Sequence, residues 1–143
     1  MQGGIVRTPE VVVGVDGSEK SVEAVRWAVD YARSKGLNVR VVSAFDIPWR
    51  IFITPTSTDE DYADAAREAL DSTMERAFPE ESDVHIQRQV VQGRPEVELT
   101  TASKNAEVLV VGSHGVGLLP GVTLGSVANY CVNHASCPVV VVR

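Results

Sequence analysis

The chain has 143 residues, of which 44% are hydrophobic and 22% are charged, and its formal net charge at pH 7 is -6. This length suits one domain, expected over residues 1–143, with enough apolar surface for a buried core. The acidic balance argues against nonspecific binding to nucleic acid or anionic membranes, because both need a basic face. No apolar run is long enough to span a membrane, and residues 1–10 lack the apolar centre of a signal peptide, so a cytoplasmic protein is expected.

Strands and helices alternate along the first part of the chain. Residues 10–16 are rich in valine and predict a strand, and Ser18 is a candidate N-cap for the helix that follows. That helix has apolar residues at helical spacing, which predict one buried stripe: Val22, Val25, Ala28, Val29 and Ala32. Gly36 is expected to end it. Residues 38–45 predict the second strand, and residues 46–58 predict an irregular loop.

The alternation continues to the end of the chain. Acidic residues 59–61 favour the start of a helix, and Pro79 is expected to end it. Residues 84–91 alternate between apolar and polar, which predicts an edge strand with one solvated face. Pro95 suits the first position of a helix that reaches about residue 104. The remaining elements are expected to be a strand at 107–112, a helix at 127–135 and a strand at 138–142.

This order of elements predicts an α/β, Rossmann-like fold: an open five-stranded parallel sheet with helices on both faces. In such sheets, ligands bind beyond the carboxyl ends of the strands, where the strand order reverses. Two strands end in residues that suggest a site, Asp16 and Gly112. The simplest arrangement places these two strands side by side, which gives the strand order 3-2-1-4-5.

A glycine-rich loop joins the fourth strand to the last helix. It holds Gly112 and Gly115, then nine residues, then Gly125 and Ser126. Glycines let the backbone approach an anion closely, and the first N–H groups of a helix have no partner within it, so the loop suits a phosphate. It is neither a Walker loop, because no Lys follows its last Gly, nor a Gly-x-Gly-x-x-Gly turn. The alternative is a connector that only turns the chain.

The pattern Gly-x2-Gly-x9-Gly-Ser resembles the nucleotide-binding signature of the universal stress protein family. Residues 11–18 resemble the family's first strand with its acidic end, residues 93–95 its Gly-x-Pro, and residues 137–142 its last strand. The resemblance extends over residues 11–143. It implies the same strand order, a bound ATP or other adenine nucleotide, and a homodimer paired through the last strand. The apolar run at residues 139–142 also suggests such pairing, because an exposed apolar edge is a hazard unless it is covered.

Asp16 is the central residue of the predicted site. At the end of the first strand it could reach the ribose, or a Mg²⁺ ion bound to the phosphates. The alternative is a turn-forming Asp whose side chain bonds nearby backbone N–H groups. The resemblance implies that the backbone of Ala44 meets the adenine. The remaining expected nucleotide-binding residues are Gly14, Val15, Val111, Gly112, His114, Gly115, Gly125, Ser126 and Val127.

No Lys or Arg lies between Gly112 and Ser126, although members of the family often carry a basic residue where Val116 stands. Phosphate charge would then be met by backbone N–H groups, the helix dipole, His114 and Mg²⁺ at Asp16. A catalytic Ser113–His114 pair is not expected, because adjacent side chains rarely point at each other and Gly-x-Ser-x-Gly is absent.

Three functions remain open. The leading interpretation is a stress-response regulatory protein that binds ATP or another adenine nucleotide. The second is a structural or interaction member of the same fold without nucleotide, or a binder of AMP or cyclic AMP. The third is an enzyme such as an adenylyl transferase, which would usually show further His or Lys motifs. At most, slow ATP hydrolysis or self-phosphorylation is expected. Cys131 and Cys137 are expected to be plain buried thiols, too few for a zinc site.

Overall fold

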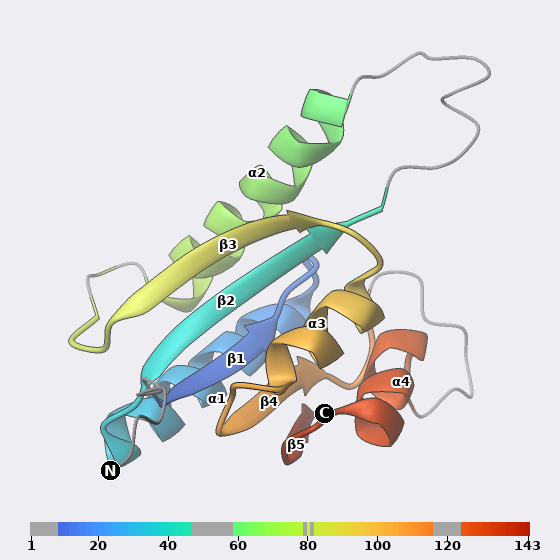
Figure 1. The fold of residues 1–143 in the computed structure, drawn as a ribbon. Helices are drawn as coiled ribbons and strands as arrows, with labels where there is room; N and C mark the ends of the chain where they lie inside the picture. The colour runs from blue at the N-terminus through green and yellow to red at the C-terminus, as the bar shows by residue number, and fades with distance from the viewer. Residues whose placement is uncertain (1–8, 47–58, 79, 81, 116–123) are drawn as a thin grey trace, which may run out of the picture.

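A computed structural model describes residues 9–46, 59–78, 80, 82–115 and 124–143. Five parallel strands form one sheet in the order β3-β2-β1-β4-β5, as predicted (Figure 1). In chain order the elements are β1 (Glu10–Gly14), α1 (Glu19–Lys35), β2 (Asn38–Phe45), α2 (Asp59–Ala77), β3 (Ile86–Gln92), α3 (Pro95–Ser103), β4 (Val108–Gly112), α4 (Ser126–His134) and β5 (Val139–Val142).

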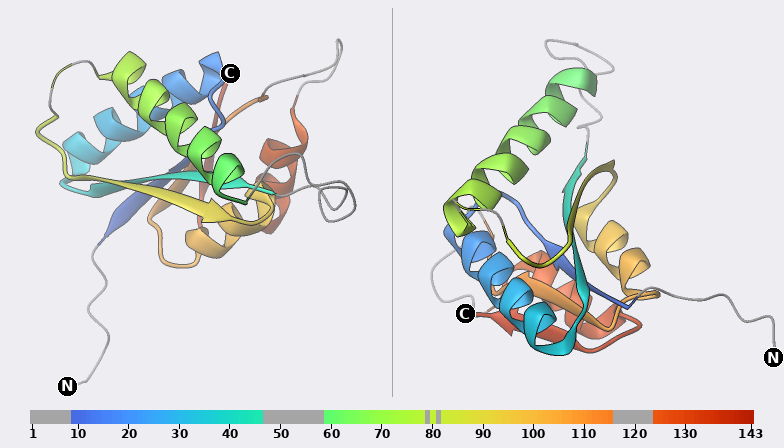
Figure 2. Two further views of the ribbon diagram at one scale, coloured as in Figure 1. Left: turned by 90° about the horizontal axis from the view of Figure 1, so that it is seen from above. Right: turned by 90° about the vertical axis from the view of Figure 1, so that its left-hand side faces the viewer.

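The sheet is covered by helices on both faces. Successive side chains of a strand point to opposite faces, so β1 contributes to two cores. Val11 and Val13 pack with residues of α1 and α2, whereas Val12 packs with residues of α3 and α4. Figure 2 shows this division: α1 and α2 lie together on one side of the sheet, and α3 and α4 lie on the other. Burial on both faces explains why β1 is a continuous valine run rather than an alternating pattern.

Local sequence signals account for the ends of α1. The Ser18 hydroxyl accepts a hydrogen bond from Ser21 N at 3.3 Å, which is the predicted N-cap. Gly36 adopts a left-handed conformation with φ of 69° and ends the helix, as expected. All five residues of the predicted apolar stripe are buried.

Several boundaries differ from the prediction by one or two residues. β1 ends at Gly14 rather than Asp16: Val15 N still donates to Val42 O at 2.9 Å, but Asp16 N donates to the Ser21 hydroxyl instead of to a strand. β3 begins at Ile86 rather than at residue 84, because Val84 N donates to the Ser82 hydroxyl. Pro79 and residues 47–58 lie outside the described part of the chain, so the expected helix stop and loop are not addressed.

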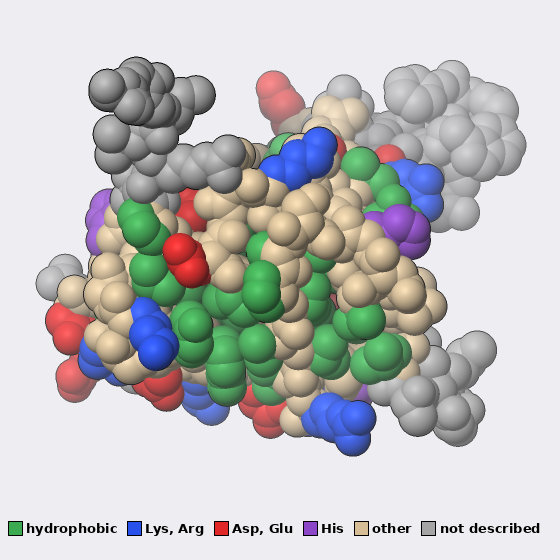
Figure 3. Space-filling view, turned by 60° about the horizontal axis from the view of Figure 1, so that its bottom comes forward, with side chains coloured by type: hydrophobic (Ala, Val, Ile, Leu, Met, Phe, Trp, Pro, Cys, Tyr) green, Lys and Arg blue, Asp and Glu red, His purple; other side chains and the backbone are tan. Residues whose placement is uncertain are grey.

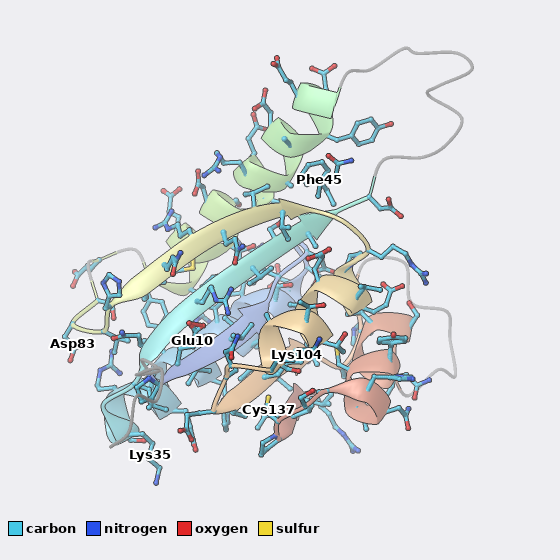
Figure 4. All side chains as sticks on the ribbon, in the orientation of Figure 1. Glu10, Lys35, Phe45, Asp83, Lys104 and Cys137 are labelled. Carbon is cyan, nitrogen blue, oxygen red and sulfur yellow. The ribbon has the colours of Figure 1, made fainter. Side chains whose placement is uncertain are left out.

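The parallel strands bring their carboxyl ends to one edge of the sheet. Figure 4 labels Phe45 at the carboxyl end of β2 and Cys137 near the opposite end of the sheet, where the strands begin. Cys131 is buried, Cys137 is half-buried, and both are free thiols. Among the described helices, none is long and apolar enough to cross a membrane.

Candidate nucleotide site

The carboxyl edge of the sheet brings the first strand and the glycine-rich loop together. β1 and β4 are neighbours, with Val13 paired to Val110, so the segments that follow them leave the sheet side by side. A Cβ atom added to Gly115 would overlap Oδ2 of Asp16. These two residues are 99 positions apart in the sequence, and both were predicted for the site. A side chain on Gly115 would therefore have to displace the Asp16 carboxylate.

Hydrogen bonds from the first turn of α1 hold the Asp16 carboxylate. Its Oδ1 accepts from Ser18 N at 3.0 Å and from the Ser21 hydroxyl at 2.7 Å. The bond to Ser18 is the turn-forming contact that was the alternative to a ligand role. The two roles use different oxygens, because Oδ1 faces α1 and Oδ2 faces Gly115. The Asp16 side chain is exposed, so the turn orients the carboxylate without removing it from solvent.

Ser113 joins the two ends of the loop, and the sequence did not single it out for this role. It is buried with 4% of its surface exposed. Its N–H donates to Val142 O and its C=O accepts from Gly125 N, each at 2.7 Å. A Cβ on Gly125 would lie 3.6 Å from Gly115 N and 3.2 Å from the Cα of His114. The two ends of the loop are therefore in contact, although nine residues lie between Gly115 and Gly125.

The side chains of Ser113 and His114 meet, contrary to the argument that adjacent side chains rarely point at each other. The Ser113 hydroxyl lies 3.0 Å from His114 Nδ1. Because Ser113 is buried, this hydroxyl cannot approach a substrate, and the contact fixes the imidazole ring instead. Nε2 is the ring nitrogen left to meet a ligand.

The N-terminus of α4 lies at the same loop. Gly125 is its N-cap, with φ of -67° and ψ of 168°, and no side chain caps the helix. Ser126 is the first helical residue and is exposed, whereas Val127 packs against the core. No acidic residue occupies the first turn of α4. The orphan N–H groups and the positive end of the helix dipole there favour an anion.

The other predicted residues at the carboxyl edge of the sheet are mostly buried or half-buried. Val15 and Val111 are buried in the two cores, so only their backbones could meet a ligand. Gly14 packs closely against α3: a Cβ there would lie 2.5 Å from Leu99 Cδ1, so a larger residue would have to shift this buried leucine. Ala44 is half-buried near the end of β2 and is paired with Val91.

A nearby lysine and the available metal ligands determine which charges could meet a phosphate. The start of α1 lies against the end of β4: a Cβ on Gly112 would be 2.8 Å from Lys20 Cβ. Sequence reasoning missed this lysine, because it belongs to another element. Within the described ranges, no group of three or more His, Cys, Asp or Glu residues could hold a metal ion. A Mg²⁺ ion at Asp16 would therefore need phosphate oxygens and water to complete its coordination.

Residues 9–143 match the family model of the Universal stress protein family. Universal stress protein Rv2624c of Mycobacterium tuberculosis (strain ATCC 25618 / H37Rv) is 34% identical over 135 residues, which make up 93% of this chain and 47% of that protein. The chain spans about half the length of the curated relatives it matches.

Solved structures of similar proteins share the fold. A universal stress protein in complex with cAMP is 26% identical with a TM-score of 0.71, and the match covers 94% of this chain and 97% of that one. The universal stress protein from Archaeoglobus fulgidus in complex with dAMP is 24% identical with a TM-score of 0.70, over 94% of this chain and 98% of that one. With the family model matched over residues 9–143, the chain belongs to the universal stress protein family.

Proposed function

We propose that this protein binds an adenine nucleotide at the carboxyl edge of β1, β2 and β4 and acts as a regulatory protein of the stress response. One observation carries the proposal: the Asp16 carboxylate and Gly115 are in direct apposition beside the end of α4 that has no side-chain cap. The cAMP and dAMP complexes of two similar proteins support adenine as the base. ATP, with or without Mg²⁺, is included in the proposed ligand class.

Each part of the nucleotide has a proposed partner. The backbone of Ala44 meets the adenine edge, next to Gly14 and Val15. Asp16 Oδ2 accepts from the ribose hydroxyls, or takes part in holding Mg²⁺ when phosphates bring the ion. The phosphates meet the loop, whose N–H groups are accessible because glycines lack side chains.

The phosphate part of the site consists of donors. The proposed backbone donors are the N–H groups of Gly115 and Val127, whereas Gly125 N–H bonds to Ser113 C=O and lets the backbone come close. The Ser126 hydroxyl and His114 Nε2 are proposed as side-chain donors. Backbone contacts of Val111 and Gly112 complete the proposed set. This arrangement binds and orients a nucleotide. Turnover, if present, is proposed to be slow.

A second candidate function is a nucleotide-free interaction protein of the same fold. It is favoured by the hydrogen bonds that Asp16 Oδ1 accepts from Ser18 N and the Ser21 hydroxyl, which give the carboxylate a role in the local turn. Nucleotide retained through purification, followed by calorimetry with AMP, cyclic AMP and ATP, separates the two candidates. A protein that is folded and binds none of the three would support the second.

The mutation that tests the site is Gly115→Asp. It inserts a negative side chain where Asp16 Oδ2 already fills the space, so binding of AMP and ATP should fall at least a hundredfold. Asn38→Asp adds the same charge at the opposite end of the sheet and should leave binding unchanged. Calorimetry measures both variants, with circular dichroism to establish that they fold. Wild-type affinity in a folded Gly115→Asp protein would refute the site.

We further propose that the protein forms a homodimer through β5. This strand is at the edge of the sheet, pairs with β4, and has four half-buried valines, Val139–Val142. Figure 3 shows hydrophobic side chains gathered on the side of the molecule where Figure 1 draws β5. Pairing of β5 with its copy across a two-fold axis would cover this apolar edge and satisfy its backbone groups.

A further inference from the structure

The first turn of α1 contacts both the end of β4 and the segment that follows β1. On one side, Lys20 contacts the end of β4, since a Cβ on Gly112 would lie 2.8 Å from Lys20 Cβ and 3.3 Å from its carbonyl carbon. On the other side, the next residue, Ser21, donates from its hydroxyl to Asp16 Oδ1 at 2.7 Å. Lys20 thus lies against the strand that enters the glycine loop, and the residue next to it, Ser21, holds the carboxylate that faces Gly115.

The charge around the loop makes this lysine important. The described loop residues, 112–115 and 124–126, include no Lys or Arg, so any cationic side chain at the phosphates belongs to another segment. Lys20 Nζ now lies 3.0 Å from Glu23 Oε2, in an ion pair whose side chains are 26% and 46% exposed. Such partly exposed pairs one helical turn apart are weak and are screened by salt. The lysine has a flexible stem and three donors, so it can exchange this carboxylate for a phosphate.

We propose that Lys20 is the cation that recognises the phosphates beyond the first, which makes the site selective for adenosine di- and triphosphates over AMP without a metal ion. This inference rests on the proposed function and adds a charged partner to its backbone donors. A nucleotide with more phosphates brings more negative charge, and a charge-assisted hydrogen bond to phosphate is about twice as strong as a neutral one. Glu23 holds the ammonium group in place when the site is empty and releases it when the phosphates arrive.

Lys20→Met tests the inference, because it keeps the alkyl stem against Gly112 and removes only the charge. Calorimetry is carried out in EDTA with AMP and with ATP. Wild type should bind ATP more tightly than AMP, and Lys20→Met should weaken ATP binding about tenfold or more while AMP affinity changes less than twofold. Lys35→Met, at the other end of α1, is the matched control and should change neither affinity. Glu23→Gln removes the competing carboxylate and should maintain or raise ATP affinity.

The other outcomes overturn the inference. An ATP-to-AMP affinity ratio that is unchanged in Lys20→Met would show that the lysine does not contact the outer phosphates. An equal loss for both nucleotides, in a variant with wild-type thermal stability, would assign Lys20 only a packing role. Arg143 follows Val142, whose carbonyl accepts from Ser113 N in the loop. Loss of the ATP preference in Arg143→Gln but not in Lys20→Met would assign the charge to Arg143 instead. If wild type binds neither nucleotide, the proposed function fails, and this inference fails with it.

Discussion

Cys131 lies on the inner face of α4 with none of its side chain exposed. Burial raises the pKa of its thiol to about 11, and the negative charges of Glu96 and Cys137 act in the same direction. Burial also raises the pKa of the Cys137 thiol, which is only half-buried. At neutral pH both thiols are protonated, which makes them poor nucleophiles and suits residues that fill a core.

The raised pKa of Cys131 predicts a loss of stability in alkali. The unfolded thiol ionises near its ordinary value of 9.0, whereas the folded one ionises at about 11, so the unfolded state loses its proton first. The stabilising effect is complete below pH 9 and is lost as pH rises to about 11. Measured by urea denaturation, the free energy of unfolding of wild type should fall by roughly 2 kcal/mol more than that of Cys131→Ala between pH 9 and about 11. Parallel pH profiles for the two proteins would contradict the raised pKa.

Some residues of the candidate site could be predicted from the sequence and others could not. Asp16 and Gly115 belong to recognisable local patterns, and the structure brings them together. Ser113 and Lys20 act through contacts with other elements: the serine joins β5 to α4, and the lysine reaches β4 from α1. A serine after a strand and a lysine in the first turn of a helix look alike in any sequence, so only the arrangement of elements reveals them.

At the scale of elements, α1 shows how local and tertiary signals combine. Its N-cap serine, its left-handed Gly36 and its buried stripe were all predicted, because each has a sequence signature with a mechanical cause. The end of β1 and the beginning of β3 were not predicted correctly. At these places the Ser21 and Ser82 hydroxyls accept hydrogen bonds from backbone N–H groups and so compete with the strand ladder. Strand ends are therefore set by hydroxyl groups that hydropathy cannot detect.

The N-cap of α1 makes a quantitative prediction. Ser18→Ala removes the acceptor for Ser21 N, and an N-cap serine typically contributes about 1 kcal/mol, so the free energy of unfolding should fall by roughly that amount. Ser34→Ala is the matched control, because that hydroxyl donates to Tyr31 O near the end of the same helix, on an exposed side chain. Its effect should be below about 0.5 kcal/mol. Urea denaturation measures both, and equal effects would argue against a specific cap.

At the scale of the whole molecule, the strand order was predictable because two rules limit it. Parallel strands joined by helices cross over with one hand, and the two strands with site-like ends had to be neighbours. The helices then divide between the two faces as the buried stripes require. The sequence could not show which side chains of β5 are left half-buried, since an apolar strand has the same pattern at an edge as in the centre of a sheet.

The proposed β5 dimer is tested by Val141→Lys. A lysine on this edge would place like charges next to each other across the two-fold axis. The dissociation constant of the dimer should therefore rise at least tenfold. Val97→Lys is the matched control: Val97 is a surface valine of α3, 37% exposed, and its substitution should leave the mass unchanged. Light scattering at micromolar concentration reports the mass. A wild-type monomer, or a Val141→Lys dimer of wild-type affinity, would rule out this interface.

Ser113 gives the molecule a mechanical connection between its two proposed surfaces. Within the glycine loop, its N–H donates to the carbonyl of Val142, the last residue of β5, and its C=O accepts from Gly125 N, the residue before α4. A shift of β5 on pairing would move the residue whose carbonyl holds Gly125 at the start of α4. By thermodynamic reciprocity, any factor by which assembly changes nucleotide affinity must equal the factor by which nucleotide changes assembly. Through this one buried serine, nucleotide binding and dimerisation would be coupled, so each would depend on the concentration of both nucleotide and protein.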